Sequence, residues 1–287
     1  MELSLIPDEV SHDPFTAFEF ARRWDIALCE LRYAYRWRVP LCPPWVADRM
    51  AAAVNAYDMT VTAISPGLFK PVLQVDGSSR PVRLSLPEEV NRHIDVHLPL
   101  ALEYAAKLGT RHLIVFALAR EPGDAADAPP PAGVVDALGR AAAKAKEAGA
   151  TLLLENGPGT WADTAAAIRA LIEAVGSEHL RLTWDPANVV HAGSAADPVA
   201  DEFPVVRPFV RNVHVKDAIR KDGRGRWVML GDGRVDWPGQ LRALREAGYR
   251  GVLTLEPHLQ YESPIDLVAT VETFVHRARA LVGGARP

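Results

Sequence analysis

Short apolar runs alternate with longer amphipathic segments along most of the chain, which predicts strands alternating with helices. The predicted strands cover residues 1–6, 26–33, 59–64, 112–118, 152–155, 182–185, 212–216 and 252–256. The predicted helices cover about residues 13–24, 44–57, 87–108, 133–148, 162–175, 197–206, 238–247 and 264–281. Eight strands alternating with eight helices favour an α/β fold, a closed (β/α)8 TIM barrel, over an open sheet.

Two segments interrupt this alternation, and one strand carries charges. The third strand is expected to end at Ser65-Pro66-Gly67, and a glycine-rich excursion at 221–233 is expected to follow the seventh strand. Glu30 and Arg32 fall on one face of the second strand. We favour a structural pairing of these two side chains inside the barrel over contact with a substrate.

The run Asn212-Val213-His214-Val215-Lys216-Asp217 is a short strand that ends in chemically active residues. Because side chains alternate along a strand, Asn212, His214 and Lys216 share one face, and the two valines share the other. An ordinary buried strand would not combine those three polar residues. Three other short apolar runs end at a carboxylate just before a loop, and these carboxylates are Glu155, Asp185 and Glu256.

The spacing of these residues matches successive strand–helix units, with 30 residues from Glu155 to Asp185 and 29 from there to His214. In a parallel barrel all four side chains project at the carboxyl edge, where barrel enzymes keep their active sites. Carboxylates gathered there repel one another without a cation, so we predict a metal site formed by Glu155, Asp185, His214 and Glu256. An oxygen-rich set with one nitrogen suits Mn²⁺, Mg²⁺ or Co²⁺, with Zn²⁺ as a further option.

Small polar residues precede three of the four predicted ligands by two positions. Thr183 precedes Asp185, Asn212 precedes His214 and Thr254 precedes Glu256. With two-residue alternation, these side chains lie one layer below the ligands inside the barrel. We therefore predict a supporting layer that orients the ligands.

Motifs after residue 150 carry a resemblance to a known family. They are Leu154-Glu155-Asn156, Trp184-Asp185-Pro186-Ala187-Asn188, His214-Val215-Lys216-Asp217, Gly231-Asp232-Gly233 with Val235-Asp236-Trp237, and Leu255-Glu256-Pro257. Together they resemble the sugar phosphate isomerase/epimerase family, within the xylose-isomerase-like TIM barrel superfamily. The resemblance covers about residues 26–275. It implies that Glu155, Asp185, His214 and Glu256 ligate one divalent metal ion, and that Glu155 and Glu256 form the acid/base pair.

The chain departs from the ketose epimerases of this family at two places. Those epimerases have a histidine three residues after the metal-binding aspartate, where this chain has Asn188, and an arginine soon after the histidine strand. Lys216, Arg220, Arg224 and Arg226 compete for the role of that arginine. The expected substrate contacts are Asn188, Lys216, Arg226, Trp161 and Trp237, the two tryptophans as an aromatic floor for a sugar ring.

Composition narrows the class of protein without changing this assignment. The 287 residues suit one barrel domain over residues 1–287, and the net charge of −4 gives no basic field for a nucleic acid. The two cysteines, Cys29 and Cys42, form no metal-binding motif, and no apolar run approaches the length of a membrane span. We expect a cytoplasmic protein, with a homo-oligomer possible, that binds a small sugar or polyol-derived molecule and neither nucleic acid nor membrane.

Three functions remain open from the sequence. The favoured one is a divalent-metal-dependent sugar isomerase or epimerase that acts on a ketose, aldose or sugar phosphate through an enediolate. The second is a metal-dependent dehydratase, a lyase, of a polyol-derived ketone such as an inosose. The third is a non-catalytic sugar-binding barrel. The abasic-site endonuclease of the superfamily is disfavoured, because the strands at 59–64 and 112–118 do not end in histidines.

Overall fold

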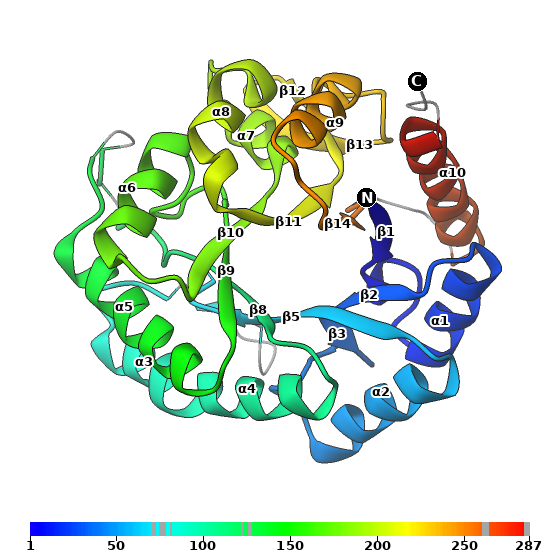
Figure 1. Ribbon diagram of the computed structural model, residues 1–287, viewed down its shortest axis with the longest axis horizontal. Helices are drawn as coiled ribbons and strands as arrows, with labels where there is room; N and C mark the ends of the chain where they lie inside the picture. The colour runs from blue at the N-terminus through cyan, green and yellow to red at the C-terminus, as the bar shows by residue number, and fades with distance from the viewer. Residues whose placement is uncertain are drawn as a thin grey trace.

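A computed structural model describes residues 1–70, 73–74, 79–80, 82–121, 123–125, 128–259 and 264–283. Eight parallel strands close into a barrel in the order β1-β14-β11-β10-β9-β8-β5-β2, viewed along its axis in Figure 1. These strands are β1 (Glu2–Leu5), β2 (Leu28–Leu31), β5 (Thr60–Leu68), β8 (His112–Val115), β9 (Thr151–Glu155), β10 (Leu180–Trp184), β11 (Val210–Val215) and β14 (Val252–Leu255). The predicted TIM barrel is confirmed.

Helices surround the barrel on its outside (Figure 1). They are α1 (Pro14–Arg23), α2 (Pro44–Ala56), α3 (Pro87–Arg92), α4 (Leu98–Lys107), α5 (Ala132–Glu147), α6 (Ala165–Val175), α7 (Pro186–Ala192), α8 (Phe203–Val206), α9 (Trp237–Glu246) and α10 (Pro264–Gly283). The helix predicted at 87–108 is α3 and α4 joined by one π-helical segment, His93–His97. Helix α7 was not predicted from the sequence. It starts directly after Asp185, because that residue caps it and Pro186 occupies its first turn.

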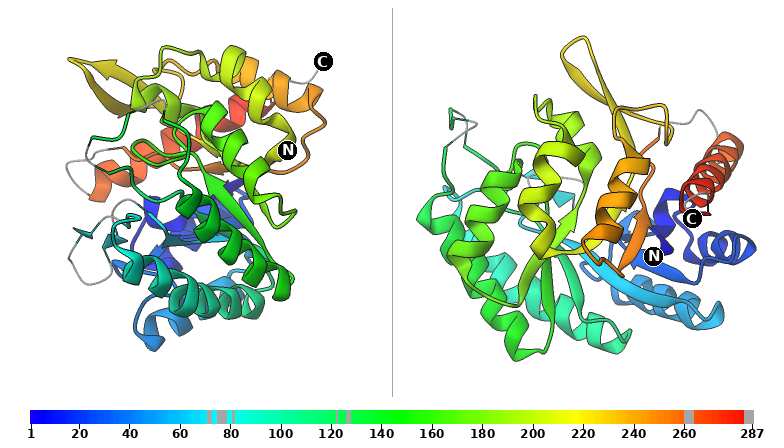
Figure 2. Two further views of the ribbon diagram at one scale, coloured as in Figure 1. Left: turned by 90° about the vertical axis from the view of Figure 1, so that its left-hand side faces the viewer. Right: turned by 45° about the horizontal axis from the view of Figure 1, so that its top comes forward.

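Two predicted boundaries were wrong. β5 does not stop before Ser65-Pro66-Gly67 but continues to Leu68, and its register against β8 shifts between Ile64 and Leu68. That irregularity accommodates a proline, which cannot donate a ladder hydrogen bond. The excursion after β11 begins earlier than predicted, as a hairpin of β12 (Asp217–Lys221) and β13 (Arg224–Val228) that projects from the barrel (Figure 2).

Apolar side chains between barrel and helices form the main core, and the barrel interior is filled differently. Outward-facing residues of β10 and β11, such as Trp184, Val213 and Val215, are buried in the main core. Inside the barrel, Ala63, Ile114 and Leu153 form a small separate apolar cluster. The polar residues Thr183, Asn212 and Thr254, predicted from alternation, are also buried and contact one another or Glu30.

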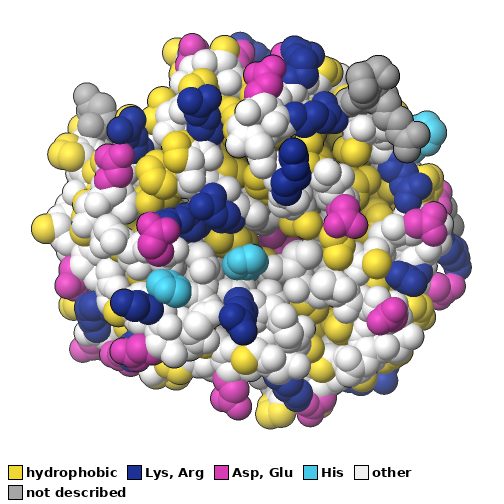
Figure 3. All heavy atoms as spheres, in the orientation of Figure 1, with side chains coloured by type: hydrophobic (Ala, Val, Ile, Leu, Met, Phe, Trp, Pro, Cys, Tyr) yellow, Lys and Arg dark blue, Asp and Glu magenta, His cyan; other side chains and the backbone are white. Residues whose placement is uncertain are grey.

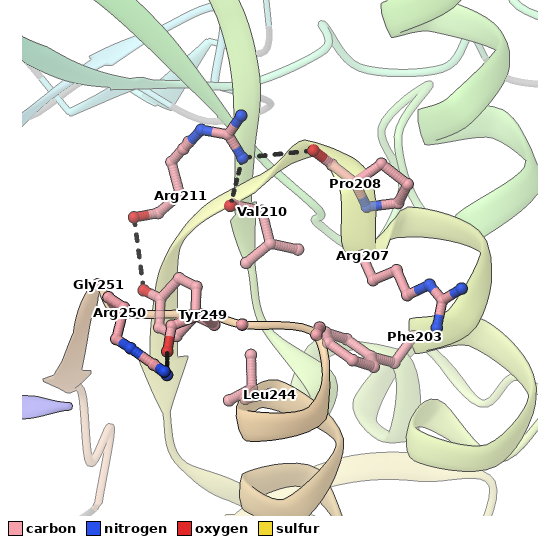
Figure 4. A pocket seen from close by; sticks show the side chains of 11 residues that line it. Phe203, Arg207, Pro208, Val210, Arg211, Leu244, Tyr249, Arg250 and Gly251 are labelled. Atoms are coloured by element: carbon pink, nitrogen blue, oxygen red, sulfur yellow. Dashed lines mark hydrogen bonds between the residues drawn. The ribbon is translucent and has the colours of Figure 1, made fainter.

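The face shown in Figure 3 carries acidic and basic side chains side by side, with hydrophobic side chains between them. A hollow at the amino ends of β11 and β14 is lined by residues that include Phe203, Arg211, Leu244 and Tyr249 (Figure 4). It lies at the opposite end of these strands from His214 and Glu256. Within the described residues, no helix is both long and apolar enough to cross a membrane.

Candidate functional site

The four residues predicted as metal ligands lie together at the carboxyl end of the barrel. Glu155 ends β9, Asp185 follows β10, His214 lies near the end of β11 and Glu256 follows β14. Each offers a ligand atom, and these atoms all lie within 4.8 Å of one another. All four residues are buried, so the carboxylates meet in an environment that penalises uncompensated charge.

Glu30 fixes the orientation of the His214 ring. Both Glu30 carboxylate oxygens lie near His214 Nε2, at 3.0 and 3.2 Å, and Glu30 is completely buried on β2. His214 Nδ1 therefore faces the other side, 3.1 Å from Glu256 Oε2 and 3.6 Å from Glu155 Oε1. Burial alone would lower the pKa of His214, but Glu30, Glu256 and Glu155 raise it well above its usual value.

Asp185 divides its two oxygens between a helix and the cluster. Asp185 Oδ1 accepts a hydrogen bond from the backbone N–H of Asn188 at 3.1 Å, which caps α7. The side chain of Asn156 clamps the Asp185 backbone on both sides, through its amide oxygen and nitrogen at 2.8 Å each. Asp185 Oδ2 points toward the cluster. Burial raises the pKa of Asp185, and the nearby Lys216 lowers it only in part.

Two ligand-type atoms of the cluster are buried without a hydrogen-bond partner among the described residues. They are His214 Nδ1 and Asp185 Oδ2. Each instead has a charged group at ion-pair distance, with Glu256 Oε2 3.1 Å from His214 Nδ1 and Lys216 Nζ 2.7 Å from Asp185 Oδ2. A divalent cation accepts a nitrogen lone pair and carboxylate oxygens together, and the donor set here fits one.

Lys216 lies within the cluster as a permanent positive charge. Its Nζ lies 2.7 Å from Asp185 Oδ2 and 2.7 Å from Glu256 Oε2, and the residue is almost fully buried. Burial would lower the pKa of Lys216, but Asp185, Glu256 and Glu155 raise it above its usual value. Lys216 therefore stays protonated in this arrangement, and it is not a base as long as those carboxylates surround it.

Glu256 contacts more cationic groups than the other carboxylates of the cluster. Its Oε1 lies 2.7 Å from Arg32 Nη1 and 3.1 Å from His258 Nε2, while its Oε2 faces Lys216 and His214. Burial would raise the pKa of Glu256, but His258, Lys216 and His214 lower it well below its usual range. Glu256 is thus held as a carboxylate.

The predicted pairing of Glu30 with Arg32 does not form. Arg32 instead extends to residues of the segment after β1, with Asp8 Oδ2 at 2.7 Å and Glu9 Oε1 at 2.5 Å from its Nη2. Glu30 instead reaches across the barrel interior to Asn212 and His214 of β11. The two charges share a face of β2 but have different partners at different depths.

The supporting layer predicted from alternation is present. Asn212 donates to Glu30 Oε2 at 3.0 Å and lies 3.5 Å from Thr183 Oγ1, while Thr254 Oγ1 donates to Asn212 Oδ1 at 3.1 Å. These side chains are buried. Because they link β10, β11, β14 and β2, they fix Glu30 and through it the ring of His214.

The five residues expected to contact substrate lie in different places. Lys216 is in the cluster, and Asn188 donates to Glu155 Oε1 at 3.3 Å, so it orients a carboxylate. Trp237 is buried and donates to the backbone oxygen of Lys216 at 3.0 Å, and Trp161 is buried beneath Arg120. Arg226 is exposed on the hairpin.

Two residues near the cluster were not singled out from the sequence. Trp227, next to Arg226 on β13, stacks on His191 at 4.1 Å between ring centroids, and its ring lies 4.7 Å from Lys216 Nζ. His258 bridges Glu9 and Glu256. The alternation Glu256-Pro257-His258 was a usable signal for His258, whereas Trp227 comes to the site only because the hairpin folds back.

Residues 10–271 match the family described as xylose isomerase-like TIM barrel. The chain belongs to this family. A xylose isomerase domain protein from Planctomyces limnophilus is similar in structure, with a TM-score of 0.73 and 21% identity over 98% of this chain and 95% of that one. A D-tagatose 3-epimerase-like protein has a TM-score of 0.71 and 16% identity over 100% of both chains. A probable 3-DHS dehydratase from Bacillus anthracis has a TM-score of 0.67 and 18% identity over 96% and 100%. The sequence matched no curated protein.

Proposed function

We propose that this chain is a divalent-metal-dependent sugar isomerase or epimerase. The observation that carries the proposal is the buried cluster of Glu155, Asp185, His214 and Glu256, whose ligand-type atoms all lie within 4.8 Å of one another. Those four side chains would hold the ion, with Mn²⁺, Mg²⁺ or Co²⁺ preferred by the oxygen-rich set. When bound, the ion would supply positive charge beside the substrate oxygens and lower the free energy of an enediolate.

Glu155 and Glu256 are the proposed proton-transfer pair. They come from β9 and β14, which are separated in the barrel by β10 and β11, so they approach a substrate from different directions. Glu155 accepts one amide hydrogen bond from Asn188, while Glu256 is surrounded by Arg32, His258 and Lys216. Removal of a proton by one carboxylate and its return by the other, on the opposite face of the carbon, inverts a centre.

The remaining groups would bind and shield the sugar. The ammonium of Lys216 is positioned to donate to substrate oxygens, since it has three donors and stays charged. Trp227 presents a ring close to Lys216 and His258, at the mouth of the cluster. We assign Trp227 the aromatic contact with the sugar, and we assign Asn188 and Trp237 to positioning Glu155 and Lys216.

Proton exchange with solvent tests this function. The purified protein, with and without a chelator, is incubated in deuterated water with a panel of ketoses, sugar phosphates and inososes. We expect deuterium uptake by the substrate without loss of water. Chelation should abolish this uptake, and Mn²⁺ or Mg²⁺ should restore it. Formation of an ultraviolet-absorbing enone assigns the dehydratase instead. Sugar binding by a metal-loaded protein that exchanges no proton assigns a binding barrel and overturns the proposal.

A further inference from the structure

Two cations beside the site lack a carboxylate partner among the described residues. Arg38, at the end of β4 (Trp37–Arg38), is 2% exposed and bonds only to neutral groups. Its Nε donates to Ser65 O at 2.9 Å, its Nη2 to Ser65 Oγ at 3.2 Å and its Nη1 to Tyr33 Oη at 3.0 Å. A guanidinium has five N–H donors, so two remain for a ligand.

Lys70, two residues beyond the end of β5, is the second such cation. Its Nζ lies 4.7 Å from the centre of the Phe116 ring and, within the described part of the chain, contacts no carboxylate. The Arg38 guanidinium has a similar ring contact, at 4.7 Å from the centre of Tyr33. Aromatic faces attract a cation, but they carry no net charge and leave it uncompensated.

The charges of the metal-type cluster act on Lys70. Burial, Arg38 and Arg32 together lower the pKa of Lys70 to about 8, against the opposite effect of Glu155 and Glu256. Lys70 is therefore within electrostatic range of carboxylates from both sides of the cluster. Ser65, which anchors Arg38, belongs to β5, so both cations are attached to the same strand of the barrel mouth.

Two buried cations at this mouth, Arg32 and Lys216, are compensated. Arg32 contacts Asp8, Glu9 and Glu256, and Lys216 contacts Asp185 and Glu256. Burying a charge is costly unless an opposite charge is near. Arg38 and Lys70 have no carboxylate contact among the described residues, which indicates that a small molecule bound at this site itself brings the negative charge.

We propose that Arg38 and Lys70 bind an anionic group, a carboxylate or a phosphate, carried by the substrate. The inference rests on the proposed function in that the reacting carbons of the same molecule would lie at the cluster of Glu155, Asp185, His214 and Glu256. A sugar acid or a phosphorylated sugar is then the substrate class, because a neutral ketose would bring no negative charge to the two cations.

Binding of three molecules with one carbon skeleton tests this assignment. D-Glucitol is neutral, D-gluconate carries a carboxylate and D-glucitol 6-phosphate carries a phosphate. Calorimetry with the purified full-length chain should show one anion, the carboxylate or the phosphate, binding about 10- to 100-fold more tightly than D-glucitol, as expected for charge-assisted hydrogen bonds. The tighter of the two anions identifies the group. Equal binding of all three overturns the proposal.

Variants locate the bound anion. Lys70→Met keeps the length and apolar stem of a partly exposed side chain, and it should weaken anion binding about 10-fold without changing binding of D-glucitol. Arg38→Lys keeps the positive charge but loses the planar pair of guanidinium donors, and it should weaken anion binding by a similar factor. Lys107→Met, an exposed lysine on α4, is the matched control and should change nothing. If Lys70→Met binds the anion as tightly as the unchanged protein does, the anion binds elsewhere and the assignment to Lys70 is wrong.

Failure of this inference is distinguishable from failure of the proposed function. Anion binding is measured without turnover, so it should persist in Glu155→Gln, which removes the proposed base. Proton exchange on a neutral ketose with no preference for anions would keep the isomerase and discard the anion site. If the protein binds anions tightly but exchanges no proton on any member of the panel, the anion site is kept and the isomerase proposal is discarded.

Discussion

The two sides of the site differ in the charge that they contribute. β9, β10, β11 and β14 end in the cluster of Glu155, Asp185, His214 and Glu256, whereas β2, β4 and the end of β5 supply Arg32, Arg38 and Lys70. Glu256 contacts groups of both sides, and Glu155 faces chiefly its own. Glu155 and Glu256 have the same proposed chemistry but unequal structural roles, because Glu256 also neutralises Arg32 on the opposite side of the site.

Replacing either glutamate by glutamine should give the largest loss of activity. Glu155→Gln and Glu256→Gln keep the shape and one oxygen but lose the basic carboxylate, so turnover should fall about 10² to 10⁴-fold with metal retained. Glu256→Gln should also lower the unfolding free energy, since Arg32 and His258 lose a charged partner. Turnover and metal content are measured together, with Glu19→Gln on the exposed face of α1 as control. Near-normal turnover in a metallated variant removes that glutamate from the mechanism.

Removing Arg32 tests the link between the two sides. Arg32→Met leaves Asp8, Glu9 and Glu256 without their shared cation, and should lower the unfolding free energy by about 3–5 kcal/mol, measured by denaturant titration. Arg23→Met breaks the exposed pair with Glu19 and should cost only about 0.3–0.5 kcal/mol. Similar losses in both variants would mean that the Arg32 network adds no stability beyond that of a surface pair.

Variants of the His214 environment should reduce metal affinity by a smaller factor. Glu30→Gln removes the charged partner of His214 Nε2 and should weaken Mn²⁺ binding about 10- to 100-fold. His214→Ala removes a proposed ligand and should weaken binding at least as much. Affinity is measured by competition with a metal indicator. Unchanged stoichiometry and affinity in His214→Ala would contradict a ligand role for this histidine.

The smallest effect is expected on the hairpin. Arg226→Ala should change KM less than about 2-fold, because the side chain is exposed, whereas Trp227→Ala should raise it about 10-fold through loss of the ring beside Lys216. Steady-state kinetics on the substrate identified by proton exchange compare the two variants directly. The reverse ranking would return Arg226 to the substrate-contact role and move Trp227 out of the site.

Local patterns determined most of the barrel and the four-residue cluster. Strand and helix periodicity depends on neighbouring residues, and a polar residue that ends an apolar strand reaches the carboxyl edge in any parallel barrel. Glu155, Asp185, His214, Glu256 and the layer of Thr183, Asn212 and Thr254 were therefore accessible from sequence. The helix α7 was missed although Asp185-Pro186 and Gly193 are ordinary helix-boundary signals, because Asp185 serves as a cap through one oxygen and faces the cluster with the other.

Partners across the ring were decided only by the tertiary structure. Arg32 meets Glu256 across 224 residues of sequence, and Glu30 meets His214 across 184. Sequence placed Glu30 and Arg32 on one face of β2 but could not choose their partners, since these depend on the depth of each side chain after β1 closes against β14. The charge of Arg38 and Lys70 was visible in the chain. Only the folded barrel shows that neither has a carboxylate contact among the described residues, because ion pairing depends on distances that ring closure sets.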